Sequence, residues 1–438
     1  MIKSNFNSKF CQYVQDNISI VEKDRKFVSD VYKSFQDVLG GNNTLQIGSY
    51  PRFTAIRPLH DLDILYILGE WDKNDHNPVS LLQSVQNKIK NEYVNPTKHT
   101  YNVSLQSHSI TIVFKEHGEE IFAVDIVPAY VYSDNEFDQD TYKVPEIAEQ
   151  KHIKRKQFYK QLQESDIDMG WIHTDPRGYI EITKQVNEVN NDFRRVVKFI
   201  KAWKNSHKEE KEEFKLKSFH IEQVIIQYYQ ENTELEIFDA IFKFFVEIPQ
   251  IIKNPSIKDR ANNHKFIDKY VEELSQYQKN LITQARDCFL KKLEKFSEND
   301  SVQEFISPCF YKRVSSSEQF LFDFNIPVLT DNSYNFKIDG LIQQKDGFRG
   351  GWLSKFFCKV DFNRKIKFQI TTTQPDVDLF KWKVRNDINS KKPRGEITDN
   401  RTLRDPEHTA LRGNHYVECY AILNNVCVAK ARRDVKLN

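Results

Sequence analysis

Three aspartates stand where the sequence predicts two apolar strands. Asp61 and Asp63 begin the apolar run 61–68, and Asp125 interrupts a second apolar run, 120–129. Residues i and i+2 of a strand point to the same face, so Asp61 and Asp63 are expected side by side. Carboxylates this close repel each other. A divalent cation with oxygen ligands, Mg²⁺ or Mn²⁺, would offset that repulsion.

A third carboxylate would complete a site for phosphoryl transfer with two metal ions. One ion would serve the attacking hydroxyl and the other the leaving phosphate. An unpaired carboxylate within an apolar strand is costly, so Asp125 should meet a cation or a basic partner. For Asp125 taken alone, a salt-bridged structural aspartate is the alternative. We predict that Asp61, Asp63 and Asp125 are catalytic and hold two Mg²⁺ or Mn²⁺ ions.

Gly48 and Ser49 precede the first acidic strand by about a dozen residues. Gly48 has no Cβ, so the backbone can approach a ligand closely at this position. Ser49 can offer its backbone N–H and its hydroxyl to a phosphate oxygen. We therefore predict that both residues bind the substrate.

Together these residues resemble a known family. The pattern of Gly48-Ser49, then Asp61-x-Asp63, then a distant strand aspartate resembles the polymerase-β-like nucleotidyltransferase superfamily. With 54–57, Thr-Ala-Ile-Arg, it is similar to the cGAS- and DncV-like enzymes of bacterial anti-phage defence. The resemblance implies an α+β fold with a bilobed core, in which a mixed sheet faces a helical lobe.

The same resemblance implies three further substrate contacts. It places Lys201, on a helix predicted over 190–204, against the nucleotide triphosphate, and it places Ser218 against the phosphates. The next residue, Phe219, would stack on the base, and such stacking does not select one base. The alternatives are an ordinary surface helix for 190–204 and a plain core position for Phe219.

The elements around these residues divide the chain. Helical periodicity over 5–39 predicts a helix with a packing role. Strand patterns dominate 40–170, and helical patterns dominate 171–309, with a continuous helix expected over 265–293. We predict a catalytic core over 1–309, with its strand-bearing lobe at about 40–170 and its helical lobe at about 171–309.

The segment 310–438 is predicted to form a smaller, β-rich domain. Its last 90 or so residues resemble the C-terminal sensor domain (adenylyl/guanylyl and SMODS type) of many bacterial nucleotidyltransferases. Residues 351–438 hold 18 Lys and Arg against 10 Asp and Glu, which favours an anionic partner, with a solvated basic surface as the alternative. Six residues could bind a nucleotide through ring stacking, anion contacts or base-edge hydrogen bonds: Trp382, Arg385, Asn386, Arg394, Arg412 and His415. Trp382 could equally be a core residue.

The composition and the distribution of apolar residues and cysteines indicate the general class of protein and its location. Hydrophobic residues make up 39% of the 438 residues, which is enough for substantial cores. No apolar run is long enough to span a membrane and the first residues do not read as a signal peptide, so a cytoplasmic protein is expected. The six cysteines are scattered, and we predict that all are reduced packing residues.

The predicted function is Mg²⁺-dependent, template-independent nucleotidyl transfer. The substrates would be ATP or other NTPs or dNTPs, and the product a cyclic or linear oligonucleotide signal in anti-phage defence, read by an effector protein that is soluble or membrane-bound. Three alternatives remain open. They are a linear oligonucleotide or DNA polymerase that controls a partner effector, a nucleotide or nucleic-acid sensor, and a toxin that nucleotidylates tRNA or protein.

Overall fold

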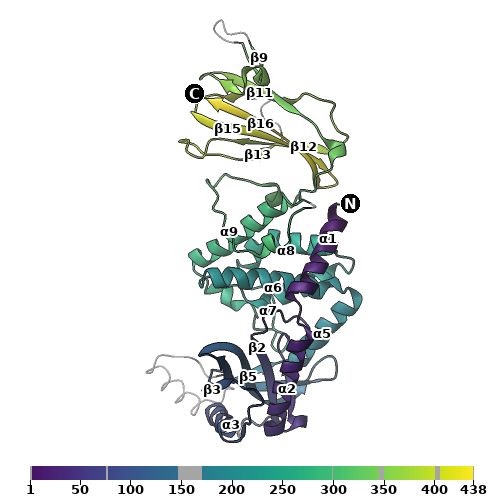
Figure 1. Ribbon diagram of the computed structural model, residues 1–438, viewed down its shortest axis with the longest axis vertical. Helices are drawn as coiled ribbons and strands as arrows, with labels where there is room; N and C mark the ends of the chain where they lie inside the picture. Colours follow the sequence, from purple (N-terminus) through teal and green to yellow (C-terminus); the bar gives the residue numbers. More distant parts are fainter. Residues whose placement is uncertain are drawn as a thin grey trace.

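The computed structural model describes residues 2–74, 77–146, 170–297, 299–344, 350–399 and 405–437. Three parts follow one another along the long axis of the molecule in Figure 1. A sheet lobe lies at one end, a helical lobe lies in the middle, and a β-rich domain formed by the C-terminal part of the chain lies at the other end. This arrangement confirms the predicted α+β class.

The sheet lobe is built on a mixed sheet with the order β1-β2-β5-β4-β3, in which β6 also pairs with β5 and β7 pairs with β6. β2 and β5 are parallel, whereas the other pairs are antiparallel. Two helices, α2 (Glu22–Leu39) and α3 (Pro78–Glu92), share an apolar core with the sheet. The strands are β1 (Thr44–Ile47), β2 (Asp61–Glu70), β3 (Thr100–Leu105), β4 (Ile110–Glu116), β5 (Glu119–Asp134), β6 (Asp140–Pro145) and β7 (Trp171–Thr174).

The helical lobe surrounds the largest apolar core of the described residues. The continuous helix expected over 265–293 is wrong in its first part, because residues 265–275 form turns and a single 3₁₀ turn (Lys269–Glu272). Ser275 then caps α9 by accepting a hydrogen bond from the N–H of Gln278 at 3.3 Å. The helices are α1 (Ile2–Tyr13), α5 (Pro176–Val189), α6 (Asp192–Glu210), α7 (Ser218–Glu231), α8 (Ile237–Ile251), α9 (Gln276–Leu293) and α10 (Gln303–Ile306).

The N-terminal helices join the two lobes. Phe6 and Phe10 of α1 are buried in the core of the helical lobe, whereas Val31 and Phe35 of α2 are buried beneath the sheet. A π-helical turn, Val14–Ile18, lies between them. The predicted packing role is therefore confirmed, and it extends over both lobes.

The C-terminal domain packs a five-stranded sheet (β10-β16-β15-β12-β13) and a four-stranded sheet (β14-β11-β8-β9) around a shared apolar core. The strands are β8 (Ile338–Ile342), β9 (Gly351–Trp352), β10 (Lys359–Val360), β11 (Lys365–Ile370), β12 (Leu379–Arg385), β13 (Ile397–Thr398), β14 (Glu407–His408), β15 (Gly413–Leu423) and β16 (Val426–Leu437).

Across the whole described chain, no helix is both long and apolar enough to cross a bilayer. Short 3₁₀ turns are Gly41–Asn43, Leu321–Phe324, Asn332–Tyr334 and Leu353–Phe356.

Two cysteines correct the prediction that all six are unpaired. Cys288 of α9 forms a disulfide with Cys309, and their Cα atoms lie 5.9 Å apart, within the usual range for such a bond. Spacing alone gave no sign of this pair because the two residues are 21 positions apart and meet only through the fold. The bond fastens the chain that leads to the C-terminal domain onto the helical lobe.

Candidate active site

A cavity of about 800 Å³ lies between the sheet lobe and the helical lobe. Its walls come from the turn after β1, the start of β2, the second half of α6 and the first turn of α7. Of the eight predicted catalytic and substrate-binding residues, seven line it: Gly48, Ser49, Asp61, Asp63, Lys201, Ser218 and Phe219. The fold thus brings together residues that are up to 171 positions apart in the sequence.

Asp125, the eighth residue, lies directly beside this cavity's acidic edge. In the parallel pair β2/β5 its Cα is the register partner of Asp63. Its carboxylate accepts hydrogen bonds from the hydroxyls of Thr111, on neighbouring β4, and of Ser109, the latter at 3.4 Å. Because neighbouring strands lie about 4.8 Å apart, the register places Asp125 next to Asp63, with Asp61 two residues earlier on the same face.

Gly48 is required by the position of Asp63. Its φ is +76°, and a Cβ built on Gly48 would overlap the Asp63 carboxylate at Oδ2. The turn after β1 therefore comes down onto an aspartate of β2, so the predicted phosphate-binding turn and the predicted metal ligands share one surface. Only glycine fits at this position without moving the carboxylate.

The carboxylates of Asp61, Asp63 and Asp125, which form the acidic edge of the cavity, repel one another. Burial, followed by the charges of Asp61 and Asp125, raises the pKa of Asp63 to about 7, against a smaller opposing effect of Arg52. Burial also raises the pKa of Asp125, whose hydrogen bond from Thr111 acts in the opposite direction. Carboxylates in this state gain from a nearby cation, so the donor set fits Mg²⁺ or Mn²⁺.

The side chains, as they lie, do not form a finished metal site. No group of three or more His, Cys, Asp or Glu among the described residues is arranged to hold one ion. The three aspartates lie on one face of the sheet, on the neighbouring strands β2 and β5, without converging on one point. Their assignment as metal ligands therefore stays a prediction.

A buried ionic cluster supports the wall opposite the acids. Glu222 of α7 is fully buried and binds Arg52, the hydroxyl of Thr54 at 2.7 Å and the ammonium of Lys201 at 2.8 Å. Burial acts to raise the pKa of Glu222, but Arg52 and Lys201 outweigh it and lower the pKa to about 2. The cluster fixes α6 and α7 against the turn that carries Gly48. Sequence patterns miss it because its partners are far apart in the chain.

Two observations refine the predicted substrate contacts. The ammonium of Lys201 is already engaged by Glu222 and Thr54, whereas Lys204, one turn further along α6, also lines the cavity. Phe219 is half-buried at the cavity wall. The Arg52 guanidinium lies 5.3 Å from its ring centroid, and the ring of Tyr179 meets it at 4.9 Å in an edge-on contact.

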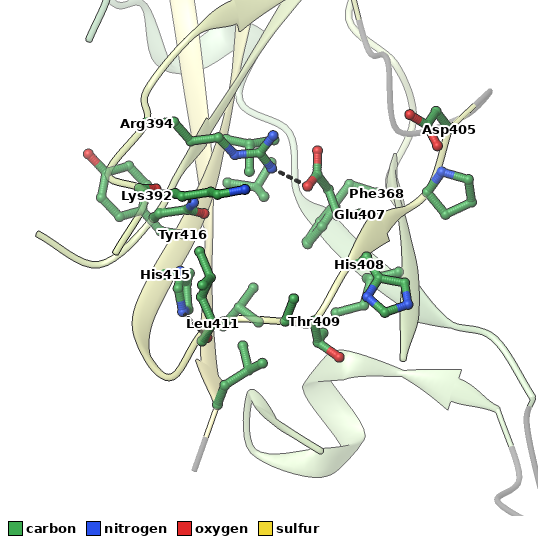
Figure 2. A pocket seen from close by; sticks show the side chains of 18 residues that line it. Phe368, Lys392, Arg394, Asp405, Glu407, His408, Thr409, Leu411, His415 and Tyr416 are labelled. Carbon is green, nitrogen blue, oxygen red and sulfur yellow. Dashed lines mark hydrogen bonds and ion pairs between the residues drawn. The ribbon is translucent and has the colours of Figure 1, made fainter. Parts of the chain in front are cut away.

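A separate cavity of about 380 Å³ lies in the C-terminal domain. It brings together three of the six predicted sensor residues, Asn386, Arg394 and His415. Figure 2 shows Lys392 and Arg394 extending from one wall, with Arg394 joined to Glu407 opposite. Asp405 and Glu407 line the cavity as well, so its charge is mixed and not simply basic.

The other three predicted sensor residues lie away from this cavity. Trp382 is 2% exposed and packs in the core of the domain, because its strand position faces inward between the sheets. Arg385 pairs with the buried Glu318 at 2.7 Å. Arg412 is exposed, with its guanidinium 5.5 Å from the ring centroid of Phe362. None of these three side chains lines the cavity, so their assignment to a sensor ligand stays a prediction.

Comparisons with known proteins agree with this architecture. Residues 312–438 match the family described as the adenylyl/guanylyl and SMODS C-terminal sensor domain. A probable cyclic nucleotide synthase of Bacillus cereus (strain VD146) is 21% identical over 226 residues. That match takes in 46% of this chain and 60% of the relative, so the chain spans less than two thirds of the curated protein that it resembles.

Solved structures extend the likeness to the fold. The structure of CdnC with ATP, from E. coli MS115-1, superposes with a TM-score of 0.50 at 18% identity, over 70% of this chain and 99% of that one. The complex of the same CdnC with HORMA-deltaN gives a TM-score of 0.49 at 17% identity, over 70% of this chain and 98% of that one.

In fold, the chain is similar to CdnC, whose structure was solved with ATP. In its C-terminal part, over residues 312–438, the chain is similar to the adenylyl/guanylyl and SMODS C-terminal sensor domains.

Proposed function

We propose that the protein joins nucleoside triphosphates into a small cyclic or linear oligonucleotide that acts as a signal. One observation carries this proposal, the interlobe cavity with carboxylates at one edge and lysines on the opposite wall. This polarity suits a nucleotide whose α-phosphate lies near the acids and whose outer phosphates lie near the lysines. The resemblance to anti-phage enzymes suggests the cellular role, in the cytoplasm, with a separate effector reading the product.

Two groups of residues would have separate roles, one in binding metal ions and one in binding the triphosphate. Asp61, Asp63 and Asp125 would hold two Mg²⁺ ions, which supply positive charge at the phosphoryl oxygens and make the attacking hydroxyl more acidic. Gly48 and Ser49 would hold the triphosphate in line for attack. This division follows from their shared position at the acidic edge.

The reaction is a displacement at phosphorus. A hydroxyl oxygen of the acceptor nucleotide bonds to the α-phosphorus, and the bond from that phosphorus to the bridging oxygen breaks. Pyrophosphate leaves with the electron pair of that bond. Asp125 would help to activate the hydroxyl and would accept its proton, which then passes to solvent.

The wall opposite the acids would position the nucleotide. Ser218 at the first turn of α7 would contact the phosphates, and Phe219 would stack on the base. Lys201 would add positive charge while its ammonium stays bound to Glu222. The cavity in the C-terminal domain would take a nucleotide ligand that regulates the enzyme, through Asn386 and His415 on its walls.

The test is product formation from labelled NTPs and dNTPs with Mg²⁺ or Mn²⁺, resolved by chromatography and mass spectrometry before and after phosphatase treatment. Asp125→Asn should lower the rate by at least about 100-fold. The matched control is Asp134→Asn, on the same strand but exposed at its far end, and it should keep the rate of the natural protein.

The possible outcomes separate the candidate functions. A phosphatase-resistant small product identifies a cyclic signal, and a phosphatase-sensitive ladder identifies a linear polymerase. Label that appears only on tRNA or protein would replace the proposal with a nucleotidylating toxin. Equal rates for Asp125→Asn and Asp134→Asn would contradict the assigned site.

A further inference from the structure

Another cavity, of about 480 Å³, adjoins the interlobe cavity and is distinct from the cavity of the C-terminal domain. We call it the second cavity. The second cavity and the interlobe cavity share three lining residues, Lys204, Lys208 and Ser218. The second cavity lies among the second half of α6, the segment 214–217, the first turn of α7, the turns over 270–274 and the start of α9. The shared residues therefore form the boundary between the two spaces.

Lys204 is the central observation at this boundary. The residue is only 7% exposed and lines both cavities. Within the described parts of the chain its ammonium has no carboxylate within ion-pair distance and no hydrogen-bond partner, in contrast to Lys201 one turn earlier. Burial, followed by the charges of Lys208 and Lys201, lowers the pKa of Lys204 to about 8. A cation that is largely shielded from water, as in this position, gains from an anionic ligand.

The rest of the second cavity strengthens this preference for anions. Four of its lining residues are lysines, Lys204, Lys208, Lys215 and Lys217, against a single acid, Glu273. Lys217 is held in place at the rim, since its backbone N–H donates to the hydroxyl of Tyr270 at 3.1 Å and its ammonium lies 4.7 Å from that ring centroid.

The position of this cavity relative to the acids suggests which anion it takes. Asp61 and Asp63 line the interlobe cavity, and the second cavity opens beyond Ser218 and Lys204. In a displacement at phosphorus, the leaving group departs on the side opposite the attacking hydroxyl. The outer phosphates of a nucleotide held by Ser218 would therefore lie next to the second cavity.

We propose that the second cavity binds inorganic pyrophosphate and is the route by which this product leaves. The inference rests on the proposed function, because only the synthesis reaction would release pyrophosphate in the interlobe cavity and send it toward the second cavity. The compact, multiply charged anion matches a small cavity with several ammonium groups better than the larger oligonucleotide, with its lower charge density, would. Lys204 and Lys208 would pass the pyrophosphate from one space to the other, and Lys215 and Lys217 would receive it.

The test is direct binding of pyrophosphate, measured by calorimetry on the full chain without nucleotide. Lys215 and Lys217 are exposed and line only the second cavity, so the double variant Lys215→Glu/Lys217→Glu should fold normally. It should bind pyrophosphate at least about tenfold more weakly, because each exchange replaces an attraction by a repulsion. Lys215→Arg/Lys217→Arg should keep the affinity, since both charges remain.

The matched control is Lys211→Glu/Lys269→Glu, the same charge change at exposed residues nearby that line neither cavity. It should change the affinity less than twofold. In the synthesis reaction, the glutamate variant at 215 and 217 should also raise the inhibition constant of added pyrophosphate. The factor of that increase should be larger than the factor by which KM for the nucleotide rises.

The outcomes are distinct from those for the proposed function. Equal pyrophosphate affinity in the two glutamate variants overturns the inference, even if the protein forms product. A short single-stranded oligonucleotide that displaces pyrophosphate at lower concentration and depends on the same lysines would also overturn it, in favour of an exit for the oligonucleotide. Lysine-dependent pyrophosphate binding in a protein that forms no product would support the site and contradict the proposed synthesis.

Discussion

The buried cluster around Glu222 allows the most quantitative prediction. Glu222→Gln keeps the shape of the side chain but removes its charge, leaving Arg52 and Lys201 buried without their carboxylate. The pKa of Glu222 falls from 4.5 to about 2, a shift of about 2.5 units, which corresponds to roughly 3 kcal/mol. Removing one partner of a buried ion pair costs about 3–5 kcal/mol, so the two approaches agree.

Hydrogen exchange measured by mass spectrometry is the suitable assay, because a chain with several parts need not unfold in one step. At pH 7, amides of α6 and α7 should exchange roughly 100-fold faster in Glu222→Gln than in the natural protein. The control is Glu231→Gln on the same helix, whose side chain is 65% exposed and pairs with Lys243 at 3.0 Å. A surface pair of this kind contributes about 0–1 kcal/mol, so its exchange should change little.

The pH dependence gives a second readout. The pKa of Glu222 is lower in the folded protein than its ordinary value of 4.5, so its contribution is complete above about pH 4.5 and is lost as the pH falls toward 2. The natural protein should lose protection in α6 and α7 over this range more steeply than Glu222→Gln does. If Glu222→Gln exchanged like Glu231→Gln at pH 7, the cluster would not stabilise this wall and the reasoning would be refuted.

Three further predictions concern the acidic edge and the disulfide. Gly48→Ala should lower product formation at least about 100-fold because its Cβ would displace the Asp63 carboxylate, whereas Gly69→Ala, also at positive φ but with open space around the Cβ, should keep most activity. Millimolar Mg²⁺ should raise the thermal midpoint of the natural protein by a few degrees and leave that of Asp61→Asn/Asp63→Asn unchanged; equal shifts would argue against metal binding there. Reducing the bond between Cys288 and Cys309 should expose two more thiols to alkylation, which mass spectrometry counts. It should also lower the free energy of unfolding by about 3 kcal/mol. The control variant Cys309→Ser should show neither response to reductant.

The acidic strands could be predicted because their signals are local. A run of apolar and β-branched residues indicates a strand, and the two-residue period then fixes the shared face of Asp61 and Asp63. The register that places Asp125 beside Asp63 did not follow from the pattern, since parallel pairing depends on how β2 and β5 meet. The requirement of a two-metal site for a third carboxylate connected the two strands in the prediction.

The C-terminal domain shows where local chemistry misleads. Trp382 and Arg385 have the residue types of a nucleotide site, but one fills the core and the other neutralises Glu318. Asn386 and Arg394 were predicted on the same grounds of residue type, and they do line the cavity. Residue type alone cannot separate these cases, because burial and pairing are set by the packing of two sheets.

The lysines of α6 show the same limit within the active site. Their three-residue spacing predicts that Lys201 and Lys204 lie on adjoining parts of one helix surface, and both do line the interlobe cavity. Their charges differ in availability, because Glu222 neutralises Lys201 and no described carboxylate pairs with Lys204. Glu222 lies 21 positions after Lys201, and only the packing of α7 on α6 brings the two together. The lysine left without a partner is the one at the boundary of both cavities, so the positive charge available to a phosphate is set by tertiary pairing and not by the spacing of lysines in the sequence.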